Sequence, residues 1–372
     1  MKIAFRVDAS LQIGTGHVMR CLTLADALQE AGAQCHFICR EHPGNLIELI
    51  RQRGFLVKVL PLTVESVVTP EQRVETQPNY VTWLGSDWNT DAEQTKVGVG
   101  ETAVEWLIVD HYALDTRWEQ MLRPVCRHLM VIDDLANRAH DCDLLLDQNL
   151  GRVERDYDQF VPKACTVLVG PHYALLRPEF AALRDVSLRR RTIPQFKHLL
   201  ITMGGVDQAD ATSKVLAALY ECPLPADLNI TVAMGQHVPW LEKVKNLSAK
   251  MPVPTEVKCN VDNMAQLMTD SDLAIGAAGS TSWERCCLGL PSMIGALADN
   301  QIFIADALQT AGAAKMFVVD DEMTWLPALM AGFFNNQSEI TKMIKCAANV
   351  TDGVGSNRVT STLLNMRLQG QS

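Results

Sequence analysis

The chain opens with IAFRVDASLQIGTGH, residues 3–17, an apolar strand pattern that runs into a glycine loop. Apolar residues then recur at helical spacing until Gly32, so the sequence predicts a helix over 17–31. A glycine loop at a helix start presents unpaired backbone N–H groups, which form a natural seat for a phosphate. The opening therefore indicates an α/β domain that is ready to bind an anion.

The same pattern returns in the second half of the chain. There the stretch LAIGAAGSTSWE, residues 273–284, again leads from a strand through a glycine loop into a helix. Only the first loop carries an imidazole, that of His17. Two α/β halves, two anion-ready loops and one base indicate a nucleotide ligand in a cleft, with the chemistry supplied from the N-terminal side.

Composition limits the possible classes of protein. The chain has 372 residues, of which 48% are hydrophobic and 20% charged, which is typical of a soluble globular protein with two domains. The formal net charge is −10, which argues against nucleic acid or an anionic membrane as the main partner. No protein partner is required by these features.

The cysteine pattern and the N-terminus favour the cytoplasm. The eleven cysteines show no C-x-x-C spacing, and several lie in apolar segments, so buried reduced thiols are expected, with zinc or redox chemistry as the alternative. No signal-peptide pattern and no apolar run long enough to span a bilayer is present in the sequence.

The order of predicted elements defines the expected fold. Short apolar strands alternate with helices, which predicts parallel sheets and an α/β class with two Rossmann-like domains facing across a cleft, followed by C-terminal helices. The predicted domains cover 1–175 and 190–350, and a C-terminal helix covers 351–372.

Three stretches have a less regular pattern. Residues 170–194 contain prolines and the basic run Arg189–Arg191, and we interpret them as an interdomain connection in which the arginines are solvated. Residues 62–104 show no clear period and receive no assigned structure. Residues 323–370 are expected to be helical throughout.

The first glycine loop is a candidate catalytic site. Gly14, Thr15 and Gly16 let a ligand approach the backbone closely. His17 lies at the first turn of the helix, where the positive end of the dipole disfavours imidazolium, so His17 is expected to be neutral and able to accept a proton. The alternative is a histidine that only packs or caps.

The second glycine loop is a candidate phosphate site. The amides of Gly279, Ser280 and Thr281, with the two hydroxyls, suit a diphosphate, and Glu284 one turn later suits the two hydroxyls of a ribose. Thr281 and Glu284 also have capping-box spacing, which would satisfy the same N–H groups without a ligand. The pattern leaves both interpretations open.

Two further loops of the second half follow predicted strands. Gly205 lets a ligand approach, although a tight turn with Asp207 or Asp210 as helix cap explains the same residues. The amides of Asn300 and Gln301 suit sugar hydroxyls or acetamido groups, with Asp299 as a helix N-cap being the alternative.

Carboxylates end several predicted strands of the first half. Asp110 ends one strand, Asp133 and Asp134 end the next, and Asp141 and Asp143 flank Cys142. Asp133 with Asp134, or Asp141 with Asp143, could bind a divalent metal, but no set of His or Cys ligands surrounds these carboxylates, so no metal is predicted. The sequence also contains no P-loop and no nucleophile elbow.

Together these motifs resemble the UDP-2,4-diacetamido-2,4,6-trideoxy-β-L-altropyranose hydrolases of pseudaminic acid biosynthesis. The resemblance extends over residues 1 to about 315 and is carried by residues 6–10, 13–21, 109–112, 132–134 and 276–284. The second loop is also similar to that of the glucosaminyltransferases of peptidoglycan synthesis, which have the two-domain GT-B architecture.

The resemblance implies hydrolysis of a UDP-linked diacetamido trideoxy sugar to UDP and the free sugar, with water attacking the anomeric carbon with inversion. It implies that His17 is the general base and that neither a cofactor nor a metal is required. Residues implied in binding UDP are Gly279, Ser280, Thr281 and Glu284. Residues implied in binding the sugar are Asp8, Gly14, Thr15, Gly16, Tyr112, Gly205, Asn300 and Gln301.

Three other functions fit the same features. The first is a UDP-sugar glycosyltransferase of GT-B type, which needs an acceptor site. The second is a UDP-sugar 2-epimerase. The third is a non-catalytic module that only binds a nucleotide sugar.

Overall fold

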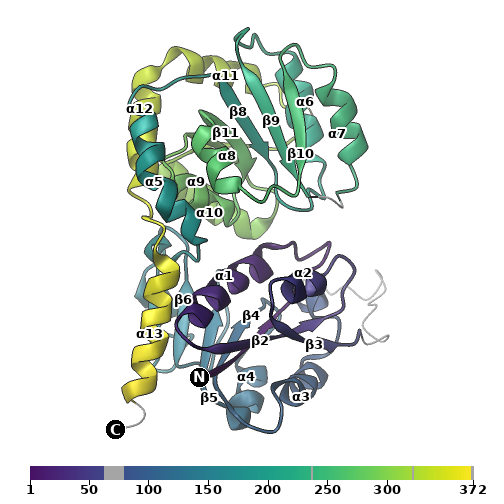
Figure 1. The fold of residues 1–372 in the computed structure, drawn as a ribbon, viewed down its shortest axis with the longest axis vertical. Coiled ribbons are helices and arrows are strands. Elements are labelled where there is room, and N and C mark those ends of the chain that lie inside the picture. Colours follow the sequence, from purple (N-terminus) through teal and green to yellow (C-terminus); the bar gives the residue numbers. More distant parts are fainter. Residues whose placement is uncertain (63–78, 236–237, 321, 370–372) are drawn as a thin grey trace. The chain divides into compact units, whose positions relative to one another are not determined.

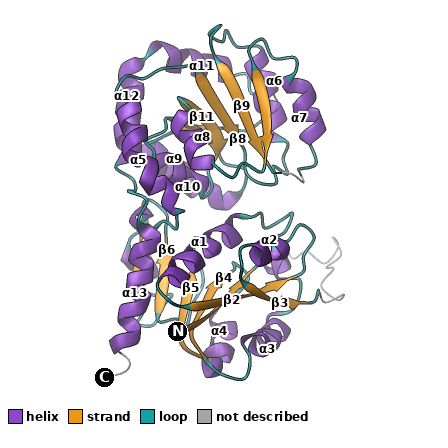
Figure 2. Cartoon of the chain, in the orientation of Figure 1, coloured by secondary structure: helices purple, strands orange, loops and turns teal. Residues whose placement is uncertain are grey.

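The computed structural model describes residues 1–62, 79–235, 238–320 and 322–369. The chain forms two compact units, Met1–Leu175 with Ser356–Ser372, and Leu176–Gly355. Each unit is built on its own parallel sheet with helices packed on it, as Figures 1 and 2 show. The predicted α/β class, the two Rossmann-like domains and the C-terminal helices are confirmed, and the cleft stays a prediction.

The first unit contains a seven-stranded parallel sheet with the strand order β3-β2-β1-β4-β5-β6-β7. Its strands are β1 Lys2–Val7, β2 Gln34–Arg40, β3 Leu56–Leu60, β4 Val104–Asp110, β5 Cys126–Ile132, β6 Leu144–Asp147 and β7 Thr166–Val169. β1 pairs with β2 and β4, and all its residues after Lys2 are buried. An apolar strand covered on both faces is what a parallel sheet requires.

Helices cover this sheet on both faces. They are α1 Gly16–Glu30, α2 Ile47–Gln52, α3 Trp88–Val99, α4 Thr116–Leu122 and α13 Gly355–Gln369, with the 3₁₀ turns η3 Asn79–Leu84, η4 Arg123–Val125, η5 Glu154–Tyr157 and η6 Pro171–Tyr173. α13 lies beside this sheet because Val359 and Leu363 are buried in the same core as Ile3 and Leu22. The end of the chain therefore completes the first unit.

The second unit contains a six-stranded parallel sheet with the order β10-β9-β8-β11-β12-β13. Its strands are β8 His198–Thr202, β9 Asn229–Met234, β10 Thr255–Cys259, β11 Leu273–Ala277, β12 Ser292–Gly295 and β13 Lys315–Phe317. Its helices are α5 Pro178–Arg190, α6 Ala211–Tyr220, α7 Leu241–Ser248, α8 Met264–Asp270, α9 Thr281–Cys287, α10 Asp299–Thr310, α11 Leu326–Asn335 and α12 Gln337–Ala348.

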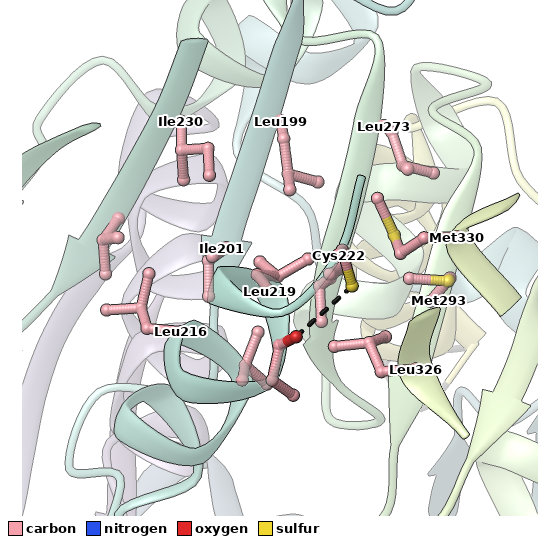
Figure 3. Close-up of a cluster of buried hydrophobic side chains, with 14 of the residues drawn as sticks. Leu199, Ile201, Leu216, Leu219, Cys222, Ile230, Leu273, Met293, Leu326 and Met330 are labelled. Atoms are coloured by element: carbon pink, nitrogen blue, oxygen red, sulfur yellow. Dashed lines mark hydrogen bonds between the residues drawn. The ribbon is translucent and has the colours of Figure 1, made fainter. Parts of the chain in front are cut away.

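The core of the second unit forms where helix side chains meet the sheet. Figure 3 shows Leu199 and Ile201 of β8 packed with Leu216 and Leu219 of α6. Cys222 lies in the same cluster, and its Sγ donates to the carbonyl of Ala218 at 3.3 Å. This thiol therefore behaves as a small buried side chain, as predicted for most cysteines here.

Both sheets reverse their strand order beside their first strand. In the first unit β1 lies between β2 and β4, and in the second unit β8 lies between β9 and β11. Open α/β sheets bind ligands at such a switch point, outside the carboxyl ends of the strands. The two glycine loops of the sequence follow β1 and β11, so each belongs to a switch point.

The boundary between the two units, Leu175–Leu176, lies within residues 170–194, and Arg189 is exposed, but the interpretation of the whole stretch as a solvated connection is wrong. Pro178–Arg190 forms α5 of the second unit, with Pro178 at its first position. Arg191 is buried and donates to the carbonyls of Met268 and Ser271 at 2.7 and 2.9 Å. The pattern was misread because an arginine that satisfies buried carbonyls has the same sequence signature as a solvated one.

Two other expectations need revision. Within 62–104, residues 63–78 lie outside the described part, but Asn79–Leu84 and Trp88–Val99 are helical, with Asp87 capping α3 at the amides of Asn89 and Thr90. The stretch 323–370 is not helical throughout, since α12 ends at Ala348 and α13 begins at Gly355.

Candidate active site

His17 lies at the first turn of α1, directly after the first glycine loop. Its Nδ1 is 2.6 Å from Oδ1 of Asp110, the last residue of β4. Burial alone would raise the pKa of Asp110, but the Arg20 guanidinium and His17 outweigh it and hold that pKa far below its ordinary value. Asp110 is therefore a carboxylate that accepts from Nδ1–H, which leaves the lone pair of the neutral imidazole on Nε2.

Nε2 of His17 makes no hydrogen bond with any described residue. The Nε2 atoms of His42, His111 and His140 are buried without a hydrogen-bond partner, whereas Nε2 of His17 is not sealed in this way. The imidazole of His17 thus has one nitrogen held by a carboxylate and the other accessible. This is the arrangement of an oriented general base.

Arg20 binds the carboxylate of Asp110, which in turn binds His17. One turn along α1 from His17, its Nε and Nη2 donate to Asp110 at 2.6 and 2.7 Å, and its Nη1 lies 2.8 Å from Asp134. Two donors from one planar guanidinium fix the orientation of the Asp110 carboxylate, and the positive charge of Arg20 keeps it ionised. Arg20, Asp110 and His17 therefore form one rigid group.

Aromatic rings pack against this group. The ring of Tyr112 meets His17 edge-on at 4.7 Å, and its hydroxyl donates to Asp134 at 2.6 Å. Tyr80 and Trp83 of η3 lie 5.0 and 5.8 Å from the Tyr112 ring. A segment without a recognisable period thus contributes two half-buried aromatic rings beside Tyr112.

The backbone of the first loop fits an anion seat. Gly14 has φ +81°, and its N–H donates to the carbonyl of Ser10 at 2.9 Å. The N–H groups of Thr15, Gly16 and His17 make no hydrogen bond within the described residues. Such unpaired donors at the start of a 15-residue helix favour negative charge.

Asp8 does not reach the surface. It is fully buried, and its Oδ1 accepts from the amide of Arg40 and lies 2.7 Å from Nη1 of Arg6. The imidazole nitrogens Nε2 of His111 and His42 lie 3.5 and 3.7 Å from Oδ2. The structure therefore places Asp8 beneath the first loop, in an ion network, without an open face for a substrate.

In the second unit, the loop after β11 has free donors. The amides of Ser282 and Trp283 bond to the carbonyls of Gly279 and Ser280, but those of Gly279, Ser280 and Thr281 make no hydrogen bond within the described residues. α9 has Ser280 at its N-cap and no side-chain cap. The capping-box alternative for Thr281 and Glu284 is therefore wrong.

Glu284 and Gln301 lie close to this loop. Glu284 is in the first turn of α9 and half-buried, and burial raises its pKa to about 7 although Arg177 and Arg285 oppose the shift. Nε2 of Gln301 is 3.9 Å from the position of a Cβ on Gly279, and its Oε1 accepts from the amide of Leu297. Asn300 is beside it on the first turn of α10, whose N-cap is Ala298, so the Asp299 cap is wrong.

The loop after β8 has a structural explanation. Asp207 accepts from the amides of Ala211 and Thr212 at 2.8 and 2.9 Å, so the alternative of a helix cap is confirmed for Asp207. Gly204 has φ +93°, and the carbonyl of Gly205 lies where a Cβ on Gly235 would stand. Gly205 therefore remains a predicted sugar contact with a packing role of its own.

The other carboxylates of the first unit are engaged by arginines. Asp133 pairs with Arg138 at 2.6 Å, and Arg123 spans Asp141 and Asp143. Over the described ranges, no three His, Cys, Asp or Glu side chains are grouped so as to hold a metal ion. All eleven cysteines are free. No helix in the described part combines the length and apolarity needed to cross a membrane.

Sequence reasoning missed several residues that surround His17. The sequence does not single out Arg20, it offers Asp134 only as a possible metal ligand, and it offers Asp110 only as a strand-ending carboxylate and an alternative to His17. The spacing of His17 and Arg20 was an available signal, since i and i+3 share a helix face. No pattern pointed to Tyr80 or Trp83, because their contact with Tyr112 depends on tertiary packing.

Comparison with known families matches part of the chain. The family described as the Glycosyltransferase family 28 C-terminal domain matches residues 198–358. An uncharacterized protein of Methanocaldococcus jannaschii is 27% identical over 298 residues, which are 79% of this chain and 55% of that protein. The chain thus spans about half the length of this relative.

A second relative is of similar length. The UDP-2,4-diacetamido-2,4,6-trideoxy-beta-L-altropyranose hydrolase of Campylobacter jejuni is 28% identical over 288 residues, 77% of this chain and 89% of that protein.

Solved structures agree on the fold. MurG of Acinetobacter baumannii has a TM-score of 0.69 at 16% identity, covering 98% of this chain and 99% of its own. A UDP-GlcNAc 2-epimerase of Neisseria meningitidis, bound to UDP-GlcNAc, has a TM-score of 0.64 at 11% identity, covering 98% of this chain and 100% of its own. The chain has a fold like that of the GT-B glycosyltransferases.

Proposed function

We propose that this protein hydrolyses a UDP-linked 2,4-diacetamido-2,4,6-trideoxy sugar to UDP and the free sugar, with His17 as general base. The observation that carries the proposal is the 2.6 Å contact between Nδ1 of His17 and Asp110, with Nε2 left accessible. His140 makes the same contact with a buried carboxylate, but its Nε2 is sealed from solvent, so the accessible Nε2 is what distinguishes His17.

The proposed reaction uses this dyad in one step. The water oxygen forms a bond to the anomeric carbon while its proton passes to Nε2 of His17. The bond between the anomeric carbon and the phosphate oxygen breaks, and UDP leaves with the electron pair, so attack from the opposite face inverts the configuration. The Asp110 carboxylate stabilises the resulting imidazolium.

UDP is already a good leaving group, so the proposal requires no strong general acid. It requires donors for the charge that gathers on the phosphate. We assign this role to the free amides of Gly279, Ser280 and Thr281, with Glu284 accepting from the ribose hydroxyls. We assign the sugar to Gly14, Thr15, Gly16, Tyr112, Gly205, Asn300 and Gln301.

The hydrolase from Campylobacter jejuni supports this choice of reaction, since its similarity covers most of both chains. The first test is to incubate the protein with a panel of UDP-linked diacetamido sugars without an acceptor and to follow the products by NMR. We expect UDP and a free sugar in equal amounts. A substrate that stays intact without an acceptor would refute hydrolysis.

A glycosyltransferase of GT-B type is the second candidate. It is favoured by the match of residues 198–358 to the C-terminal domain of Glycosyltransferase family 28. The same incubation distinguishes the two, because a transferase would release UDP only when a sugar acceptor is added.

A further inference from the structure

Arg285 lies beneath the proposed diphosphate loop and is 1% exposed. Its Nη2 donates to the carbonyl of Ala277, the last residue of β11, at 2.8 Å and to Oγ of Ser282, on the first turn of α9, at 3.0 Å. The loop 278–281, which carries the free amides, runs between these two contacts. One guanidinium nitrogen therefore ties the two ends of the loop together.

The charge of Arg285 interacts electrostatically with the carboxyl group of the adjacent Glu284, but within the described part of the protein it is not held in an ion pair. Its Nη1 is buried without a hydrogen-bond partner, and no described carboxylate forms an ion pair with it. Burial lowers the pKa of Arg285 to about 10, which still leaves it protonated at neutral pH. A buried cation outside an ion pair is destabilising, so its retention requires an explanation.

Other buried arginines of the chain are satisfied differently. Arg6 and Arg20 pair with buried or nearly buried carboxylates, and Arg191 donates to the carbonyls of Met268 and Ser271. Among the described residues, the hydrogen bonds of Arg285 are those at the two ends of the loop. Arg285 is thus a buried cation outside an ion pair, and it lies next to donors that favour an anion.

Gly276 makes room for this guanidinium. A Cβ on Gly276 would overlap Nη1 of Arg285 and would lie 3.0 Å from the carbonyl oxygen of Thr202. Any side chain at this point of β11 would displace Arg285 or the neighbouring strand. Gly276 is therefore explained by the close approach of Arg285, in the same way as other glycines that allow tight packing.

We infer that Arg285 is a positioning residue for the nucleotide diphosphate: it holds the loop 278–281 in its donor geometry, and the bound diphosphate balances its charge. This inference rests on the proposed function. Arg285 acts through the loop and not by direct contact. The diphosphate should depend on it, and the uridine part of the ligand should not.

The test compares UDP with uridine, which lacks the phosphates. UDP affinity is measured by calorimetry and uridine affinity by NMR titration, for wild type and Arg285→Met. We expect UDP affinity to fall about tenfold or more, as for a lost charged interaction, while uridine affinity changes less than about twofold. Arg285→Lys keeps the positive charge but lacks the guanidinium that contacts both ends of the loop. Its loss of UDP affinity should be smaller than that of Arg285→Met.

Arg191→Met is the matched control, because Arg191 is an equally buried arginine of the second unit that bonds only to carbonyls of α8 and its C-terminal end. It should leave the ratio of UDP to uridine affinity unchanged. If Arg285→Met does not fold, Gly276→Ala displaces the same guanidinium and should weaken UDP selectively.

If Arg285→Met lost affinity for UDP and uridine equally, or lost none for UDP, the inference about Arg285 would be overturned but the proposed function would stand. A wild-type protein that does not bind UDP would overturn the proposed function as well.

Discussion

His17 and His140 share one geometry but differ in exposure. In both residues Nδ1 lies 2.6 Å from a buried carboxylate, Asp110 for His17 and Glu119 for His140. Nε2 of His140 is buried without a partner, whereas Nε2 of His17 is not. Of these two histidines, His17 is therefore the one that can exchange a proton with a substrate water, and His140 serves as its internal control.

We predict that His17→Asn lowers kcat by about 10²–10⁴-fold, the usual contribution of a positioned general base, with little change in UDP affinity. His140→Asn is expected to lower stability and to leave kcat within about twofold of wild type. Steady-state kinetics of the two variants decide the matter. Near-wild-type turnover of His17→Asn would remove His17 from the mechanism.

Glu284 provides a pH test of nucleotide binding. Burial raises its pKa to about 7, so the carboxyl becomes ionised as the pH rises through neutrality. Only the carboxylate accepts from both ribose hydroxyls. Wild-type UDP affinity, relative to Glu284→Gln, should therefore increase from about pH 6 to about pH 8. A ratio that does not change with pH would exclude Glu284 from the ribose site.

At the scale of elements, the basic run at the end of α5 contains two very different arginines. Arg191 is buried and donates to the carbonyls at the C-terminal end of α8, whereas Arg189 is exposed. We predict that Arg191→Met lowers the free energy of unfolding by about 1–3 kcal/mol, because buried carbonyls lose their donor.

Arg189→Met is the control for this measurement and should change stability by less than about 0.5 kcal/mol. Urea unfolding of both variants gives the comparison. Equal effects of the two substitutions would mean that the run is solvated after all, as the sequence alone suggested.

The same elements show what sequence can and cannot predict. α1 was placed within one residue because its apolar period, its glycine loop and Gly32 all agree. The η3 turn and α3 were missed because Asn79–Val99 has no apolar period, and its packing is set by contacts such as that between Trp83 and Tyr112. Local pattern predicts an element well only where one face is consistently apolar.

For the candidate site, the sequence located the two glycine loops but not the buried side chains that support them. His17 and the loop 279–281 follow from their position after a strand. Arg20, Asp110 and Arg285 were not identified as supporting groups, because an ion pair or a clamp between distant residues leaves no local period. Buried polar partners have to be read from the folded structure.

At the scale of the whole molecule, the chain repeats one plan twice. Each unit has a parallel sheet whose order reverses beside its first strand, with a glycine loop at that point. The first unit adds a base held by a carboxylate, and the second adds a loop whose two ends are bonded to the buried guanidinium of Arg285. The proposal assigns the attacking water and the anomeric carbon of the sugar to the first unit and the nucleotide to the second unit.

The most direct measurement of this account is the fate of the attacking oxygen. The reaction is run without acceptor in water labelled with heavy oxygen, and both products are analysed at once by mass spectrometry. Attack on the anomeric carbon predicts that the label enters the free sugar and is absent from UDP. Label in the UDP phosphate, or no turnover in the absence of an acceptor, would contradict it.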